Sequence, residues 1–313
     1  MRTRRGLRGM VLLLASVMLV ACGTSQEVNG SSQPQGASLR ITLGTQVFPE
    51  ARILGELWRQ ALAVNGYTVD LRKGVGPAED LDALLQEGEI DGYVAYTGTV
   101  LSIVAGEDVT GLDPEETYEK AKAFYETRDM EMSAMTPFEN KDAIATTSRF
   151  AQRERLRSIA DLAELPSFTL AARPEFESLY LGLEGLEDLY GLSNAEFEPV
   201  PVGRQYQALE NGTADAVDAF TTDPQLREGD YQVLEDPELL FGSQNVVMVV
   251  GSDELERVGK ETFLEVVDTV NGLLTQDEII SLNAAVTGGQ DEEDVANAFL
   301  RQAGLLTPMG GEG

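Results

Sequence analysis

Short apolar strands alternate with amphipathic helices from residue 39 onward, and this alternation restricts the fold more than any other feature of the sequence. Apolar side chains recur at helical spacing in the longer segments, and glycine or proline ends most of them. The first predicted elements are a strand at 39–43, a helix at 50–64, a strand at 68–72, a helix at 78–86, a strand at 90–95 and a helix from Asp113 to about Arg128. This order predicts an α/β fold with largely parallel sheets.

A second run of the same kind begins near residue 142. It comprises a helix capped by Ser158, a strand at 168–171, a helix ending at Tyr190-Gly191 and a strand near 197–200. The chain then has one strand at 246–250, followed mainly by helices. A chain of 313 residues with 42% hydrophobic content can form two compact lobes, each with its own core.

Charge and composition exclude several classes of function. The chain has 23 basic and 53 acidic residues, and duplex binding requires basic side chains that neutralise phosphates, so no nucleic-acid partner is expected. It has no histidine and one cysteine, which removes histidine bases, cysteine–histidine pairs, histidine metal sites and intrachain disulfides. A phosphate-binding loop and a calcium loop are also absent from the sequence, and we expect no cofactor or metal.

The amino terminus has the features of an export signal. A basic start precedes an apolar run from Met10 to Ala21, which is shorter than the roughly 20 residues needed to span a bilayer. Leu19-Val20-Ala21-Cys22 resembles a bacterial lipobox, in which the cysteine is lipidated after cleavage; a free thiol in an uncleaved anchor is the alternative. We therefore expect a signal peptide at 1–21, a polar tether at 22–38 and a protein held outside the cytoplasmic membrane by lipid on Cys22.

One segment of the first run recurs in the second. Gly88–Thr99 aligns without a gap on Gly212–Asp223, so that Tyr96 matches Phe220 and a threonine follows each ring. Each copy comes after an apolar helix and predicts a glycine helix stop, a short strand and an aromatic residue at the strand's carboxyl end. Ligands of open α/β sheets bind beyond these ends. The two rings are therefore expected to face a shared cleft, unless both are ordinary core residues.

Several segments, in order, resemble the lipid-anchored substrate-binding proteins of ABC importers for glycine betaine, choline and related osmolytes. The segments are LGTQVFPEARILGELWRQAL (43–62), NGYTV (65–69), GEIDGYVAYTGT (88–99), DPEETYEKAK (113–122), RPEF (173–176) and YQALENGTADAVDAFTTD (206–223). The resemblance covers residues 39–302. It implies a bilobal type II periplasmic-binding fold, with lobe 1 at 39–138 and 243–313 and lobe 2 at 139–242, joined by a hinge that the chain crosses twice. It also implies an ABC permease, with its ATPase, as partner.

In this family a box of aromatic side chains holds the trimethylammonium group of the ligand. A quaternary nitrogen has no N–H to donate, so ring faces meet its charge best, at about 0.5–2 kcal/mol each. By position, the resemblance implies that Tyr96 is a tyrosine of this box and that Thr99 helps hold the other end of the ligand. Phe220 stands where a tyrosine is usual, and so keeps the ring without the hydroxyl.

The chain departs from the family pattern at four positions. Asp142 and Gln244 stand where aromatic residues are usual, so two of the four walls of the box are rings. Gln46 replaces a lysine, and Leu179 replaces an arginine, that would hold the carboxylate of a betaine. The resemblance therefore implies a site without the family's two cationic partners for a carboxylate.

These departures favour a cationic ligand without a carboxylate, such as choline or another amine. An ionised Asp142 in a closing cleft would be desolvated at a cost unless a cation met it. Three alternatives stay open: Asp142 is out of register and solvated, Gln244 is likewise out of register, or Arg173 replaces the missing clamp at Leu179. The ligand-binding residues that we expect are Gln46, Tyr96, Thr99, Asp142, Phe220 and Gln244.

The expected protein is thus a monomeric receptor for a small cationic or zwitterionic solute, without catalytic residues. A binding protein for another polar solute is the first alternative. An enzyme that uses Asp142 and Asp223 as paired carboxylates is the second, and a lipoprotein with a vestigial cleft is the third. Trp58 lies on the apolar face of the first helix and is expected in the core.

Overall fold

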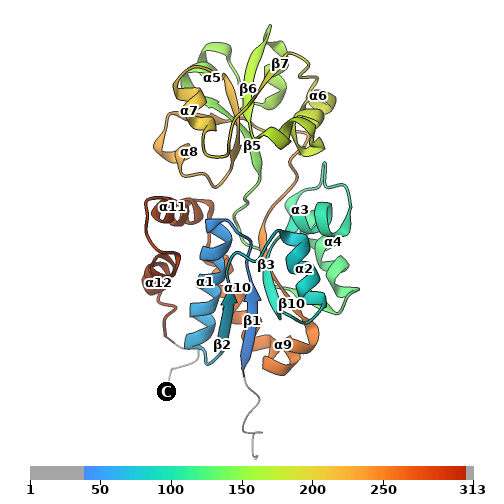
Figure 1. Ribbon diagram of the computed structural model, residues 1–313, viewed down its shortest axis with the longest axis vertical. Coiled ribbons are helices and arrows are strands. Elements are labelled where there is room, and N and C mark those ends of the chain that lie inside the picture. Colours follow the sequence, from blue (N-terminus) through green and yellow to red (C-terminus); the bar gives the residue numbers. More distant parts are fainter. Residues whose placement is uncertain (1–38, 308–313) are drawn as a thin grey trace, which may run out of the picture. The chain divides into compact units, whose positions relative to one another are not determined.

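The structure is a computed structural model that describes residues 39–307 (Figure 1). The signal peptide, Cys22 and the tether expected from the sequence lie outside the described residues. Within residues 39–307, none of the helices combines the length and the apolar character that crossing a membrane requires.

Two five-stranded sheets, each with its own helices, make up the described chain (Figure 1). The sheet of lobe 1 has the order β2-β1-β3-β10-β4 and contains β1 (Arg40–Gly44), β2 (Thr68–Arg72), β3 (Gly92–Tyr96), β4 (Met130–Met132) and β10 (Val246–Gly251). The sheet of lobe 2 has the order β7-β6-β8-β5-β9 and contains β5 (Asp142–Thr147), β6 (Phe168–Ala172), β7 (Ala195–Pro199), β8 (Ala216–Phe220) and β9 (Tyr231–Val233).

Helices and shorter helical turns fill the connections between strands. Those of lobe 1 are α1 (Pro49–Val64), α2 (Ala78–Gln86), α3 (Thr97–Thr99), η1 (Val100–Ala105), α4 (Pro114–Glu126), α9 (Ser252–Val258), α10 (Lys260–Leu273), α11 (Gln276–Thr287) and α12 (Glu292–Gln302). Those of lobe 2 are α5 (Ser148–Glu154), η2 (Ile159–Glu164), η3 (Pro174–Ser178), η4 (Tyr180–Glu184), α6 (Gly185–Tyr190), α7 (Gln205–Glu210) and α8 (Gln225–Glu228). Most of the longer elements begin and end within two residues of the predicted positions.

Both faces of the lobe 1 sheet are covered, because alternate residues of its central strands enter different cores. Val94 and Tyr96 of β3 belong to the cluster formed with α1, α10, α11 and α12, whereas Tyr93 and Ala95 belong to the cluster formed with α2 and α4. Trp58 lies in the first cluster, 1% exposed, as the sequence predicted. Its indole nitrogen donates to Asn271 Oδ1 at 2.8 Å.

The expectation of largely parallel sheets was wrong, because each sheet is mixed. In lobe 1, β1 pairs in parallel with β2 and β3, but β10 runs antiparallel to β3 and β4. In lobe 2, β6 pairs in parallel with β7 and β8, but β5 runs antiparallel to β8 and β9. The cause is that the chain passes between the lobes twice. β5 begins after the connection at 133–141, and β10 begins after the connection at 234–245. Both strands therefore run opposite to neighbouring strands that end at these connections.

The repeated segment has the same local structure in both lobes. We call this structure the corner; it comprises residues 88–99 in lobe 1 and 212–223 in lobe 2. Gly88 and Gly212 follow α2 and α7 with φ values of 71° and 69°, the left-handed conformation that glycine adopts without strain. The aspartate three residues later is fixed alike in each copy: Asp91 Oδ2 accepts from the Thr42 amide at 2.6 Å, and Asp215 Oδ2 accepts from the Thr169 amide at 3.0 Å. Each copy then runs into a five-residue strand that ends in an aromatic residue.

Candidate functional site

A cavity of about 500 Å³ lies where the repeated corners of the two lobes meet the two connections. This volume is within the range of roughly 300–1,000 Å³ found for small-molecule sites. All six residues expected from the sequence line the cavity, namely Gln46, Tyr96, Thr99, Asp142, Phe220 and Gln244. The structure thus brings together side chains from both lobes that are up to about two hundred positions apart in the sequence.

A threonine after each ring attaches the corner to a connection between the lobes. The Thr97 amide donates to the Asn245 carbonyl at 3.0 Å, and the Thr221 amide donates to the Lys141 carbonyl at 3.0 Å. The Thr221 hydroxyl also donates to the Glu139 carbonyl at 2.7 Å. The two connections pair with each other through a bridge between Glu139 and Asn245. The position of each ring therefore depends on hydrogen bonds to the backbone of the two segments that connect the lobes.

Four aromatic side chains line the cavity, two more than the sequence predicted. Tyr96 is 5% exposed and Phe220 is half-buried. The additional rings are Phe48, at the start of α1, and Phe241, which is 3% exposed and comes three residues before Gln244. The Phe48 and Tyr96 rings lie 5.7 Å apart at 47°. Both additional rings stand within three positions of a residue that the resemblance had marked, which was the signal available for finding them.

Polar groups occupy the lobe 1 side of the cavity. Gln244 Oε1 accepts from the Thr99 amide at 3.0 Å and from the Thr99 hydroxyl at 3.3 Å. Gly98 allows this close approach, because a Cβ there would lie 2.5 Å from the Ser243 carbonyl oxygen. Gln46 is 5% exposed, and its Oε1 has no hydrogen-bond partner in the described structure. This oxygen is available to accept from a ligand donor.

Asp142 is paired within the protein. Arg173 donates to both carboxylate oxygens of Asp142, at 2.6 and 3.2 Å, and also to Asp218. The side chains of Asp142, Arg173 and Asp218 are 21%, 14% and 5% exposed, respectively. Burial, together with the neighbouring Asp142 carboxylate, raises the pKa of Asp218 well above its usual value. The Arg173 guanidinium also lies 5.5 Å from the centroid of the Phe220 ring.

Two expectations from the sequence are corrected by this pairing. Asp142 lines the cavity but is not an unpaired carboxylate, because Arg173 donates to both of its oxygens. Arg173 does not replace the missing carboxylate clamp, because two aspartates already hold it. Leu179, at the family's arginine position, is 40% exposed and is not among the residues that line the cavity.

The two carboxylates of the enzyme alternative each have partners of their own within the protein. Asp223 accepts from the Tyr206 hydroxyl at 2.8 Å and from the Phe220 amide at 3.0 Å, so it supports the corner of lobe 2. Asp142 is held by Arg173 instead. Within residues 39–307, no cluster of three or more acidic, histidine or cysteine side chains is arranged to hold a metal ion.

Glu50 lies beside the Tyr96 hydroxyl and was not singled out from the sequence. Its Oε1 accepts from the Tyr96 hydroxyl at 2.9 Å and from Asn140 Nδ2 at 2.8 Å, and its Oε2 accepts from Asn283 Nδ2 at 2.7 Å. Burial raises the pKa of Glu50, and the hydrogen bonds that it accepts from Asn283, Thr222, Asn140 and Tyr96 oppose that rise. A single carboxylate thus joins the cavity wall, a connection between the lobes and α11.

Comparison with known proteins identifies the family to which the chain belongs. The model for the substrate-binding domain of ABC-type glycine betaine transport systems matches residues 40–302. A curated relative, the ergothioneine transport permease/ergothioneine binding protein EgtU of Helicobacter pylori, is 23% identical over 269 residues, covering 85% of this chain. The chain spans about half of that relative's length, 48%.

Solved structures with the same fold include a glycine betaine/carnitine/choline ABC transporter structure, with 21% identity and a TM-score of 0.78, covering 85% of this chain and 99% of that one. Another is apo YehZ from Escherichia coli, with 24% identity and a TM-score of 0.72 over the same shares. The two mixed sheets are those of a bilobal type II periplasmic-binding fold. Solute binding, not catalysis, is the role of such proteins. The chain belongs to the family of substrate-binding domains of ABC-type glycine betaine transport systems, extracytoplasmic components that serve an ABC importer.

Proposed function

We propose that this receptor binds a small solute with a quaternary ammonium or related cationic group, of the choline and glycine betaine class. The observation that carries the proposal is the convergence of Phe48, Tyr96, Phe220 and Phe241 on one cavity. Ring faces provide the contact that a cation without N–H donors can use, and water-excluding walls strengthen it. Four rings thus line the cavity although two positions of the family pattern are not aromatic, and this supports an aromatic box as the binding site.

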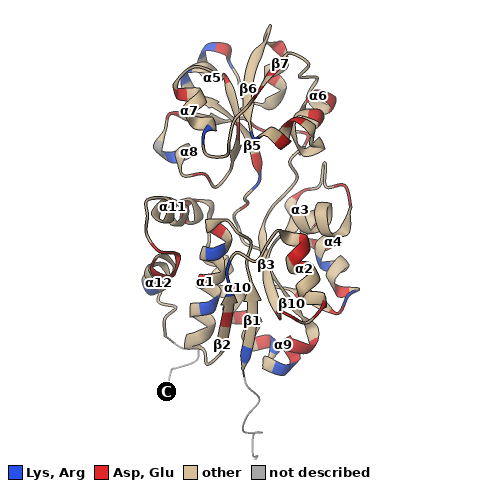
Figure 2. Ribbon diagram, in the orientation of Figure 1, with Lys and Arg blue, Asp and Glu red and all other residues tan. Residues whose placement is uncertain are grey.

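The charges around the cavity support a cation over an anion. Lys141 is the only basic residue among the described side chains that line the cavity, and its ammonium lies 3.2 Å from Glu139 Oε2. A ligand carboxylate would therefore meet amide and hydroxyl groups instead of an unpaired cation. Acidic residues also mark α2, α6 and α9 (Figure 2), and a surface of net negative charge concentrates cations near it.

The binding mechanism that we propose is closure of the two lobes around the ligand. Tyr96 belongs to lobe 1 and Phe220 to lobe 2, and each is attached through its threonine to a connection between the lobes. A cation that contacts both rings is bound more tightly when the lobes approach, and it therefore shifts the protein toward the closed form. The closed form is the state that the permease would recognise.

Titration calorimetry with choline, glycine betaine and ergothioneine tests this proposal. We expect choline to bind more tightly than glycine betaine, because the cavity offers rings for the ammonium and no unpaired basic side chain for the carboxylate. Ergothioneine belongs in the set because the curated relative is named for it. Ergothioneine has both a trimethylammonium group and a carboxylate, so binding of ergothioneine alone would keep the quaternary ammonium class and contradict the expected preference for a ligand without a carboxylate. No heat from any of the three solutes would contradict the proposal.

Export and anchoring complete the proposal. The basic and apolar start, followed by Leu19-Val20-Ala21-Cys22, supports cleavage before Cys22 and lipidation of its thiol. A lipidated cysteine and the polar segment to residue 38 would keep the binding lobes near the permease at the membrane surface. We propose that the protein acts there as a monomer.

A further inference from the structure

We infer that Glu50 provides the negative charge that makes this cavity prefer a cation, acting as a positioning residue through the Tyr96 hydroxyl. The inference rests on the proposed function, since it assigns a source of charge selectivity to the same cavity. Glu50 is 4% exposed and does not itself line the cavity, but it contacts two side chains that do, Tyr96 and Asn140.

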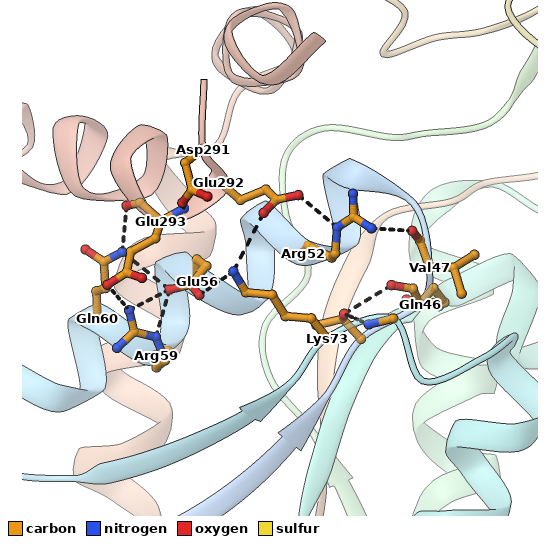
Figure 3. A network of polar contacts seen from close by, with 12 residues as sticks. Gln46, Val47, Arg52, Glu56, Arg59, Gln60, Lys73, Asp291, Glu292 and Glu293 are labelled. Carbon is orange, nitrogen blue, oxygen red and sulfur yellow. Dashed lines mark hydrogen bonds and ion pairs between the residues drawn. The ribbon is translucent and has the colours of Figure 1, made fainter. Parts of the chain in front are cut away.

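The two buried glutamates of α1 have opposite surroundings. Glu56 is 3% exposed and lies in the network of Figure 3, where Arg59 and Lys73 each approach its carboxylate to 2.7 Å. The same network neutralises Glu292 through Arg52 at 2.9 Å. Among the described residues, by contrast, no Lys or Arg forms an ion pair with Glu50. A buried carboxylate without a cation is costly, so a cation that binds nearby is stabilised by it.

The surroundings of Glu50 nevertheless favour its ionised form. Tyr96, Asn140 and Asn283 all donate hydrogen bonds to it, and an ionised carboxylate is the form that only accepts. Glu50 also stands in the first turn of α1, where the helix dipole stabilises negative charge. These donors and the helix dipole oppose the rise that burial causes in the pKa of Glu50.

We expect the negative charge of Glu50 to act on the ligand through the Tyr96 side chain. A phenol that donates to a carboxylate gains electron density, and the face of an electron-rich ring attracts a cation more strongly. The Tyr96 ring lines the cavity while its hydroxyl contacts Glu50, so the same side chain touches both the ligand space and the buried acid. Asp142, the acid expected from the sequence, differs from Glu50 because it has an ion pair with Arg173.

The experiment compares choline with 3,3-dimethylbutan-1-ol, which has the same shape with carbon in place of the charged nitrogen. Competition calorimetry gives the ratio of the two affinities, and that ratio isolates the effect of charge from shape and packing. We expect Glu50→Gln to lower the ratio about tenfold, because the charge acts on choline alone. The amide oxygens of Asn140 and Asn283 have no partners in the described structure, so these side chains can turn to accept from the new glutamine.

Two further variants separate charge from structure. Asn283→Lys leaves Glu50 in place and gives it a cation from α11, so we expect the ratio to fall even if Glu50→Gln does not fold. Glu56→Gln is the matched control, since it removes a buried carboxylate of the same helix whose charge is already neutralised. We expect it to lower thermal stability and to leave the ratio within about twofold of the unchanged protein.

The outcomes distinguish this inference from the proposed function. If the unchanged protein binds choline no better than the alcohol, the cationic ligand class fails and the inference fails with it. If choline is preferred but folded Glu50→Gln or Asn283→Lys keeps the full preference, the proposed function stands and Glu50 is not its source. A parallel loss in Glu50→Gln and Glu56→Gln would show a structural effect and would also overturn the inference.

Discussion

Replacing Arg173 by alanine is expected to lower the free energy of unfolding by about 3–5 kcal/mol, because it leaves two largely buried carboxylates without their cation. The guanidinium also covers the Phe220 ring, so part of the loss is packing against the cavity wall. Urea denaturation of purified protein at neutral pH measures the effect. A change below about 1 kcal/mol, typical of exposed ion pairs, would show that this contact is not buried in solution.

The same variant should depend on pH in a definite direction. Burial already raises the pKa of Asp218, and removal of Arg173 takes away a cation that opposes this rise. A carboxyl whose pKa is higher in the folded than in the unfolded protein destabilises the fold when ionised, and this cost disappears as the pH falls through the folded value. The deficit of Arg173→Ala is therefore expected to shrink at lower pH. A triple variant with Asp142→Asn and Asp218→Asn should recover part of the stability at neutral pH.

Replacing Tyr96 by alanine is expected to weaken binding of the cationic ligand by about 1–3 kcal/mol, or roughly 5- to 150-fold. The variant removes a ring that lines the cavity, the contact with Phe48 and the hydroxyl that donates to Glu50. Titration calorimetry with the tightest-binding solute measures the loss. Tyr96→Leu, which retains apolar volume without a π face, should lose most of the same affinity.

Val94→Ala is the matched control for this result. Val94 lies two residues before Tyr96 on β3, in the same core cluster, but it is not among the residues that line the cavity. The control should lower stability and leave affinity unchanged. Equal losses of affinity in Val94→Ala and Tyr96→Ala would mean that Tyr96 acts through the core and not through the ligand.

The repeated corner is the part of the structure that could be predicted from local sequence. Glycine, aspartate, strand and ring recur at identical spacing, and each feature has a local physical cause: a left-handed glycine, a carboxylate bonded to the neighbouring strand and a strand that ends at the sheet edge. The direction of β10 was not foreseeable in the same way. It depends on which end of the sheet the returning chain enters, and strand-like residues at 246–250 do not encode that end.

The surroundings of the acidic residues at the site could not be predicted, because they depend on contacts between segments that are far apart in the sequence. Glu50 follows Pro49 at the start of a helix, where an acidic residue is ordinarily solvated, but Asn283 of α11 comes from 233 positions away to cover it. The pairing of Arg173 with Asp142 likewise joins the end of β6 to the start of β5 across 31 positions. Position in the sequence was sufficient to predict six of the residues that line the cavity. Which acids are buried, and which of them form ion pairs, depends on contacts between distant segments.

A crystal structure of the protein with the tightest-binding member of the solute set would test the central claim most directly. We expect the cationic nitrogen within about 6 Å of the centroids of both the Tyr96 and Phe220 rings, with one ring from each lobe in contact. A ligand bound elsewhere, or one whose charged group contacts neither ring, would contradict the account.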